Sequence, residues 1–210
     1  MNIKFLNVAL GVALTATTLS ATAQKVYKEG VITSTTSMRG MDVQPKMYFT
    51  ADSTAMAVTM GAANVKVITD SKMSYLAVLL DVPVASMKKA GIATPAELED
   101  GEAQLPKFTF APTTETKQIS GFNCKKVVAT DSKTNKKYDI WVTNDVSLPT
   151  IATARYYQGI GGFPIKYTSF SQGEGVEVTI TGITEQKVPA GTFGISKDYQ
   201  KGTLAELSAQ

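Results

Sequence analysis

The chain contains no histidine and only one cysteine, Cys124. Without histidine it cannot form a Ser-His-Asp triad, a Cys-His pair or any zinc site that uses imidazole. A single cysteine cannot form an intramolecular disulfide, so stability in an oxidising compartment must come from a packed core. We therefore predict a protein that is not an enzyme, with no catalytic residue, no metal site and no cofactor.

Charge is also scarce and nearly balanced. The 210 residues carry 21 Lys and Arg against 18 Asp and Glu, and the only arginines are Arg39 and Arg155. A nucleic-acid-binding protein presents a clustered basic face, whereas these lysines are scattered. An arginine can bind a phosphate or carboxylate through two hydrogen bonds, but isolated arginines more often form surface ion pairs. We expect no nucleic-acid partner and assign no role to either arginine.

Long apolar runs are rare, and the clearest one opens the chain. Lys4 precedes an apolar stretch from Phe5 to Leu14, which passes into Thr, Ser and Ala and ends at Ala21-Thr22-Ala23. This is the pattern of a signal peptide with a small-x-small cleavage site; a buried or membrane-spanning helix would need a longer apolar core. We expect residues 1–23 to be removed, which lowers the net charge from +3 to +2 because Lys4 is the only charge lost.

Residues 24–210 are then expected to form a single exported domain, periplasmic or secreted and soluble. A chain of this length can bury a substantial core. Its longest mainly apolar run, residues 75–85, is interrupted by Asp81 and is too short to cross a bilayer, so we predict no membrane span. The expected cleavage point carries no cysteine that could receive a lipid anchor.

Short runs rich in Val, Ile, Thr and aromatic residues dominate the rest of the chain and alternate with turn residues. They predict hairpins over residues 46–60, 65–80, 124–143 and 163–186, within a sheet of about nine to eleven strands. Short helices are predicted at 85–89, at 94–99 with Thr94 as N-cap and Pro95 at the first helical position, and near 203–207. The predicted fold class is mainly β, an antiparallel sheet with a few short helices.

All seven methionines that follow the expected cleavage site lie between Met38 and Met87. Thioethers suit Cu(I), so a methionine copper site is one interpretation. The methionines are spread over several strands without a tight repeat, which favours a second interpretation, in which they fill the core or line an apolar cavity. The pattern does not separate a packed core from a ligand-lined one, because both have the same composition.

Four acidic residues, Glu97, Glu99, Asp100 and Glu102, gather in the stretch TPAELEDGEA. Their spacing lacks the D-x-D-x-D-G order of a calcium loop. Acidic side chains at the start of a helix are usually a solvated cap that complements the helix dipole. We interpret the cluster as such a cap.

Cys124 and Trp141, the only tryptophan, lie in one predicted hairpin. The adjacent Lys125 and Lys126 would lower the pKa of an exposed thiol, but the strand position favours a small buried hydrophobe. One register places Cys124 on the face of Ile140, and a slip of one residue places it on the face of Trp141.

Several segments resemble a known family. SGFNCKK (Ser120–Lys126), followed by a hairpin into YDIWVT (Tyr138–Thr143), resembles the centre of an uncharacterised domain-of-unknown-function family of secreted Bacteroidetes proteins, similar in turn to the GLPGLI proteins. GIGGFPIKY (Gly159–Tyr167) resembles the Gly-Leu-Pro-Gly segment of those proteins. The resemblance implies a LolA-like lipoprotein-carrier fold, a strongly curved half-barrel sheet with short helices on its concave side over an apolar hollow. It implies no reaction.

Together these observations predict an exported, non-enzymatic module that binds a lipid, an acyl chain or another apolar small molecule in the half-barrel. The main alternative is a structural or interaction protein of the cell envelope with a solid core and an envelope protein as partner. Copper binding by methionines is less favoured. The residues expected to line the cavity come from the Met-rich strands and the tryptophan hairpin: Met47, Phe49, Met56, Val58, Met60, Met73, Tyr75, Leu79 and Trp141.

Overall fold

The computed structural model describes residues 24–38, 40–171 and 174–209, so the predicted signal peptide lies outside the described residues. Within these ranges the chain forms fifteen strands and two α-helices. The first strands are β1 (Lys25–Val26), β2 (Gly30–Met38), β3 (Met41–Val43), β4 (Lys46–Phe49), β5 (Ser53–Met60), β6 (Ala63–Asp70), β7 (Leu76–Val82) and β8 (Met87–Ile92). After helix α1 (Pro95–Gln104) come β9 (Phe108–Ile119), β10 (Phe122–Asp131), β11 (Lys137–Thr143), β12 (Val146–Ser147), β13 (Phe163–Ser171), β14 (Glu174–Glu185), β15 (Gln200–Thr203) and helix α2 (Leu204–Ser208).

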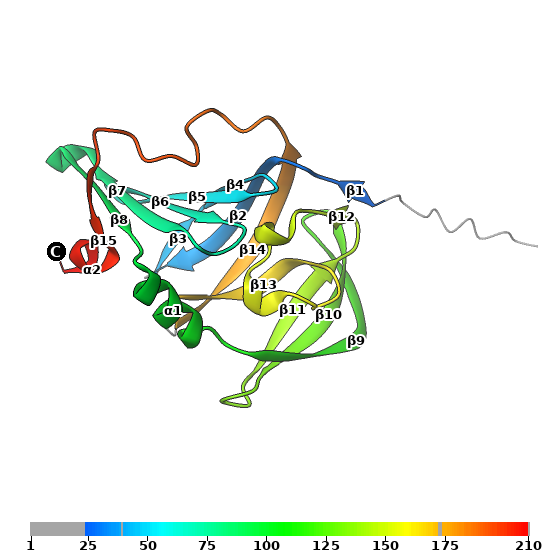
Figure 1. The fold of residues 1–210 in the computed structure, drawn as a ribbon. Helices are drawn as coiled ribbons and strands as arrows, with labels where there is room; N and C mark the ends of the chain where they lie inside the picture. The colour runs from blue at the N-terminus through cyan, green and yellow to red at the C-terminus, as the bar shows by residue number, and fades with distance from the viewer. Residues whose placement is uncertain (1–23, 39, 172–173, 210) are drawn as a thin grey trace, which may run out of the picture.

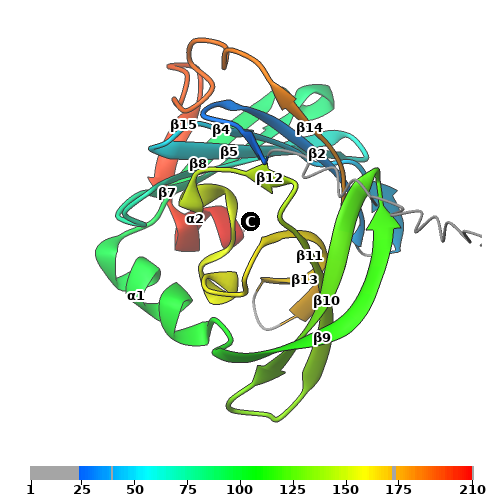
Figure 2. The same ribbon diagram turned by 90° about the vertical axis from the view of Figure 1, so that its right-hand side faces the viewer.

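Thirteen of the strands form one sheet, in the order β15-β8-β7-β6-β5-β4-β2-β14-β13-β11-β10-β9, with β3 paired to β2. All pairs in it are antiparallel except β15 with β8. The sheet curves strongly, and Figure 2 shows its strands surrounding an interior segment of the chain. Among the described residues its end strands β9 and β15 do not pair, so the sheet stays open. The predicted fold class, a curved antiparallel sheet with a few short helices, is confirmed.

The interior of the sheet is occupied by residues 148–162, which connect β12 to β13 and contain two 3-10 turns, η2 (Thr150–Ala152) and η3 (Arg155–Tyr157). Figure 2 shows this yellow-green segment inside the curve of the strands. Ala152 packs with Ile32 and Phe49 in the first core cluster, and Tyr157 packs with Ile140 in a second. Burial of these side chains supplies the driving force that holds the segment inside the sheet.

Both helices carry the N-terminal signals that the sequence contains. The Thr94 hydroxyl accepts a hydrogen bond from Glu97 N, while Glu97 Oε2 accepts one from Thr94 N, which completes a capping box. Thr203 and Glu206 form the same arrangement at α2. The predicted helices at 94–99 and near 203–207 are therefore confirmed, and Figure 1 shows α1 linking β8 to β9 on the side where the sheet is open.

The predicted helix at 85–89 is wrong. Pro83–Ala85 form only a 3-10 turn, and Met87–Ile92 form β8. This strand pairs with β7 on one side and with β15 on the other, and Ala90 and Gly91 within it are buried. Pairing on both sides satisfies the backbone of a segment whose own pattern is weak, so the tertiary context decides its structure.

The two faces of the β4–β8 region can be followed through the register. A continuous row of paired residues crosses the strands on the inner face: Ile32, Met47, Met56, Val67, Val78 and Gly91. Helix α2 packs on this face, because a Cβ added at Gly91 would lie 3.0 Å from Leu207 Cβ. The outer face carries a third core cluster, which includes Ala77 and Leu79 and is covered by Phe193, Ile195 and Tyr199. We call residues 186–199, which carry these three side chains across the outer face, the strap (Figure 1).

Candidate functional site

The structure brings together five of the nine residues predicted to line a cavity. Met47 and Phe49 of β4 lie on the same inner face as Met56, Val58 and Met60 of β5, because Met47 pairs with Met56. Phe49 is fully buried, and Met47 packs against the same core cluster, which Ala152 of the interior segment joins. At Met47 and Phe49 this face is therefore packed against other side chains.

The other four predicted residues lie elsewhere in the chain, although Trp141 packs against the same core cluster as Met47 and Phe49. Tyr75 and Leu79 belong to the outer face of the sheet and pack in the cluster under the strap. Trp141 pairs across from Lys126, and Lys117 Nζ lies 4.0 Å from the centre of its ring. Met73 lies in the turn between β6 and β7 with a φ of 54°. Of the nine residues, only Met73 borders the pocket described next.

A pocket of about 830 Å³ lies between α1, α2, the start of β7 and the end of β13. This volume is within the range of about 300–1,000 Å³ that is usual for small-molecule sites. Figure 2 shows α1 and α2 on the same side of the molecule, beside β7 and β8. The apolar part of the lining comes from all four elements and their flanks: Met73, Leu76, Ala93, Pro95, Leu98, Leu105, Phe170, Leu204 and Ala205.

Half of the polar residues in the lining are acidic. All four carboxylates of α1 contribute to it, together with one cation, Arg155 of η3. Arg155 Nη1 lies 3.1 Å from Glu102 Oε1, which ties the interior segment to α1. Glu97 Oε1 accepts a hydrogen bond from Ala205 N at 2.8 Å, which ties α1 to α2. Hydrogen bonds from the backbone of Thr94 and Ala205 lower the pKa of Glu97, so this link holds at neutral pH.

The floor of the pocket continues into a cluster of aromatic rings. Phe170 lines the pocket and makes edge contacts with Tyr138 and Tyr156, with ring centres 5.2 Å and 5.5 Å apart. Tyr157 stacks on Phe108 and donates a hydrogen bond to Thr168 O at 2.7 Å. Burial raises the pKa of Tyr156 and Tyr157, so both phenols are neutral at physiological pH and serve as packing groups.

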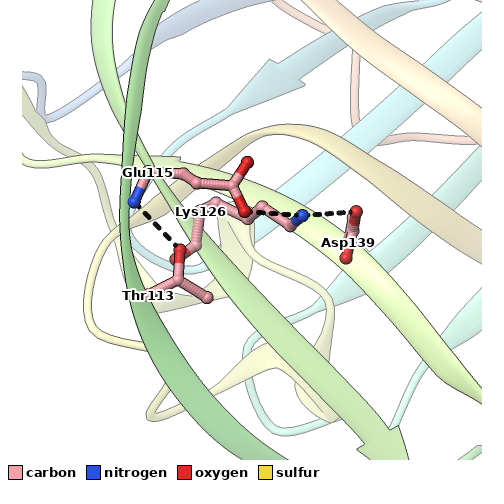
Figure 3. Close-up of polar contacts among 4 residues, drawn as sticks. All are labelled: Thr113, Glu115, Lys126 and Asp139. Carbon is pink, nitrogen blue, oxygen red and sulfur yellow. Dashed lines mark hydrogen bonds and ion pairs between the residues drawn. The ribbon is translucent and has the colours of Figure 1, made fainter.

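A second polar cluster lies on the face of β9, β10 and β11 shown in Figure 3. Lys126 Nζ lies 2.8 Å from Asp139 Oδ2 and 3.0 Å from Glu115 Oε1. The hydrogen bonds to Asp139 and Glu115 raise the pKa of Lys126, so its amine stays charged. Thr113 Oγ1 accepts from Glu115 N and donates to Lys126 O, next to a register shift in the β9–β10 pairing. We interpret this cluster as a structural link that holds β9, β10 and β11 together where their pairing is irregular.

The register question around Cys124 is resolved. Cys124 pairs with Thr143, which places the thiol on the face of Trp141. Only 2% of Cys124 is exposed, as predicted for a small buried hydrophobe. Burial raises its pKa to about 11, so the thiol is neutral at physiological pH.

The sequence interpretation missed most of the pocket. Leu76, Leu98, Leu105 and Phe170 are scattered over the chain, and no periodicity connects them. Two signals were present: the capped helix at residues 94–99, and Arg155, one of only two arginines. Neither signal reveals that the two lie side by side, because this depends on how the chain closes around the open side of the sheet.

Residues 29–199 match the family described as "Domain of unknown function (DUF4412)". The chain belongs to this family. The match covers most of the chain and spans the strands from β2 to β14 together with α1, whereas β15 and α2 lie outside it. The further likeness to GLPGLI proteins and to LolA-type carriers stays a prediction. No curated protein matches the sequence.

Solved structures of PNGF-II, in C2 and P21 space groups, are similar to 86% and 87% of this chain. The sequence identities are 17% and 16%, and the TM-score is 0.49 for each. The chain corresponds to 32% of the PNGF-II chain, about a third of its length.

In the described part of the chain, no three His, Cys, Asp or Glu side chains converge in the way that metal ligands do. Across these same residues, neither helix has the length and apolar character needed to cross a membrane.

Proposed function

We propose that this protein is an exported, non-enzymatic module that binds an apolar small molecule or an acyl chain in the pocket between α1 and α2. The observation that carries the proposal is the pocket itself, about 830 Å³ in volume, with an apolar floor and a charged mouth. Such a combination of apolar walls and a few polar groups is typical of ligand sites. The absence of histidine from the whole sequence supports a binding role over catalysis.

The location differs from the one that the Met-rich strands predicted. Residues 148–162 fill the centre of the half-barrel, so Met47 and Phe49 have protein neighbours. The pocket lies at the open side of the sheet, where α1 spans the distance between β8 and β9. A ligand would reach it without displacing the interior segment.

Titration with Nile red, a neutral apolar dye, tests the proposal. We expect saturable binding of one dye per chain, with a fluorescence increase and a Kd of about 1–10 μM. Dodecanol should compete with the dye. Absence of saturable binding would contradict the proposed function and favour the alternative of an interaction module that acts through its surface.

Two tryptophan substitutions on α1 locate the site. Gly101 lines the pocket, and a Cβ at this position meets no atom within 4 Å, so Gly101→Trp can be accommodated by the helix while its ring occupies the pocket mouth. Ala103 is exposed on the same helix and outside the lining, which makes Ala103→Trp the matched control. We expect Gly101→Trp to weaken dye binding by about tenfold, and Ala103→Trp by less than about twofold.

Export is tested separately. The apolar stretch and Ala21-Thr22-Ala23 support a signal peptide. The protein isolated from its native host should be found outside the cytoplasm with Gln24 as its first residue. An intact N-terminus on cytoplasmic protein would contradict export and leave the binding proposal unaffected.

A further inference from the structure

We infer that the ligand of the pocket between α1 and α2 is a cationic amphiphile, an apolar chain that ends in an ammonium group. This inference rests on the proposed function and adds the charge of the ligand. The pocket supplies the volume and the apolar floor for the chain. The side chains at its mouth determine which charge the other end of the ligand carries.

The charges at the mouth are unequal. Glu97, Glu99, Asp100 and Glu102 line the pocket, and Arg155 is the only basic residue in the lining. Four carboxylates against one guanidinium leave a formal charge of −3 around the pocket. A site with one sign of charge at its entrance, beside a low-dielectric wall, concentrates ligands of the opposite sign.

The single cation is already paired. Arg155 Nη1 lies 3.1 Å from Glu102 Oε1, so its charge is largely offset by a carboxylate of the same mouth. An acyl chain ending in a carboxylate would have to compete with Glu102 for this guanidinium. It would also bring a further negative charge close to Glu99 and Asp100, which is unfavourable at short range.

Two carboxylates remain for a ligand. Glu97 is engaged by the backbone N–H groups of Thr94 and Ala205. Among the described residues, Glu99 and Asp100 make no ion pair, and both are exposed on α1. An ammonium group at the mouth would satisfy these two charges without breaking an existing contact.

Phe170 adds an independent feature that suits a cation. Its ring lines the same pocket as α1, and its edge contacts with Tyr138 and Tyr156 hold it in place. The face of an aromatic ring attracts ammonium groups, most strongly where the site is partly shielded from water. An aromatic ring and unpaired carboxylates in one lining therefore both favour a ligand that carries an ammonium group.

The experiment uses three probes with the same chain length: dodecyltrimethylammonium, dodecanol and dodecanoate, each kept below the concentration at which it forms micelles. Their affinities for the full mature chain are measured by isothermal titration calorimetry and by displacement of Nile red. We expect dodecyltrimethylammonium to bind about tenfold more tightly than dodecanol, and dodecanoate more weakly than dodecanol. Added salt should reduce the difference, because the mouth is exposed to solvent.

A double substitution assigns the preference to the mouth. Glu99→Gln combined with Asp100→Asn removes both charges and keeps the size of each side chain. This double variant should reduce the preference for dodecyltrimethylammonium over dodecanol to about threefold or less. The matched control, Asp52→Asn with Glu185→Gln, removes the same charge from exposed residues outside the lining and should keep the preference.

The outcomes separate the two proposals. Binding of all three probes with equal affinity, or tighter binding of dodecanoate, overturns the cationic ligand and leaves the apolar site standing. The cationic ligand is also overturned if the Glu99→Gln, Asp100→Asn variant and the control variant lose the preference for dodecyltrimethylammonium equally. The effect would then come from the net charge of the protein. If none of the probes and no Nile red binds, the proposed function itself is wrong.

Discussion

Cys124 lies among apolar side chains of the first core cluster, where burial raises its pKa to about 11. Lys126 is held between Asp139 and Glu115, and the Tyr157 hydroxyl donates a hydrogen bond to a backbone carbonyl. Each of these residues carries a chemically useful group. In each case the surrounding structure keeps that group neutral or paired, so its role is packing or cross-linking of strands.

The first prediction concerns the thiol. Native protein should react with a thiol reagent only as fast as the structure opens locally or globally. Cys124→Ser should lower the free energy of unfolding by about 1–3 kcal/mol, because it buries a hydroxyl in an apolar site. Cys124→Ala, which adds no polar group, is the control and should cost less. Urea unfolding measures both. Fast labelling of native protein would contradict the buried position.

The same residue predicts a dependence on alkaline pH. The pKa of Cys124 is raised from 9.0 to about 11 in the folded state, so folding favours the neutral thiol. Its contribution to stability is present below pH 9.0 and is lost as the pH rises through about 11. Wild type and Cys124→Ala should therefore differ in the slope of stability against pH over this interval. Equal slopes of stability against pH in the two proteins would argue against a raised pKa of Cys124.

At the scale of elements, the helices are linked by their ends. Glu97 caps α1 and also accepts a hydrogen bond from Ala205 N at the start of α2, so one carboxylate serves both helix N-termini. α2 in turn packs on β8 at Gly91. The pocket is thus bounded by two short helices whose relative position depends on one carboxylate and one glycine.

Glycine at position 91 should be necessary for this packing. A Cβ there would lie 3.0 Å from Leu207 Cβ and from Thr203 O, so Gly91→Ala requires these atoms to shift by a few tenths of an ångström and should cost about 1–3 kcal/mol. Gly101→Ala is the matched control: its Cβ meets no atom within 4 Å, and it should stabilise α1 by about 0.5–1 kcal/mol. Thermal unfolding compares them. Equal stability of the two variants would contradict the close contact.

The strap predicts a dependence on acidic pH. Asp198 Oδ2 lies 2.7 Å from Lys88 Nζ, and hydrogen bonds from Lys88 and Ser196 lower the pKa of Asp198 from 3.8 to about 2. The pair therefore contributes above pH 3.8, and the contribution is lost as the pH falls through about 2. The urea midpoints of wild type and Asp198→Asn should differ at pH 5 and converge near pH 2. If the two urea midpoints differ by the same amount at pH 5 and at pH 2, the charge of Asp198 is not responsible for the difference.

At the scale of the whole molecule, the sheet is covered on both faces, but in different ways. The strap closes the outer face of β5–β8 over Leu79, while the interior segment and α2 occupy the inner side. The pocket is left at the open side of the sheet, between α1 and α2. Stability and binding should therefore depend on different parts of the same strands.

Two leucines of β7 test this separation. Leu79 is 2% exposed beneath the strap, so Leu79→Ala should cost about 2–5 kcal/mol while the folded fraction keeps its affinity for Nile red. Leu76 lines the pocket, so Leu76→Ala should cost less and should change dye binding by about threefold or more. Chemical denaturation and dye titration on the same samples give both quantities. A loss of binding in Leu79→Ala at full folding would contradict the separation.

Local sequence is sufficient to specify several local features of the fold. The alternation of residues 54–60, the turn residues of the hairpins and the capping box at Thr94 depend only on neighbours in the chain, and the structure has a strand or helix at each of these places. The sequence does not predict β8, because pairing with β7 and β15 overrides a weak local pattern. Tertiary structure alone decided that Tyr75 and Leu79 face the strap, that residues 148–162 fill the half-barrel, and that Leu76, Leu98 and Phe170 meet in a pocket. The physical reason is that periodicity defines which residues share a face, whereas the elements that cover that face come from segments far away in the chain.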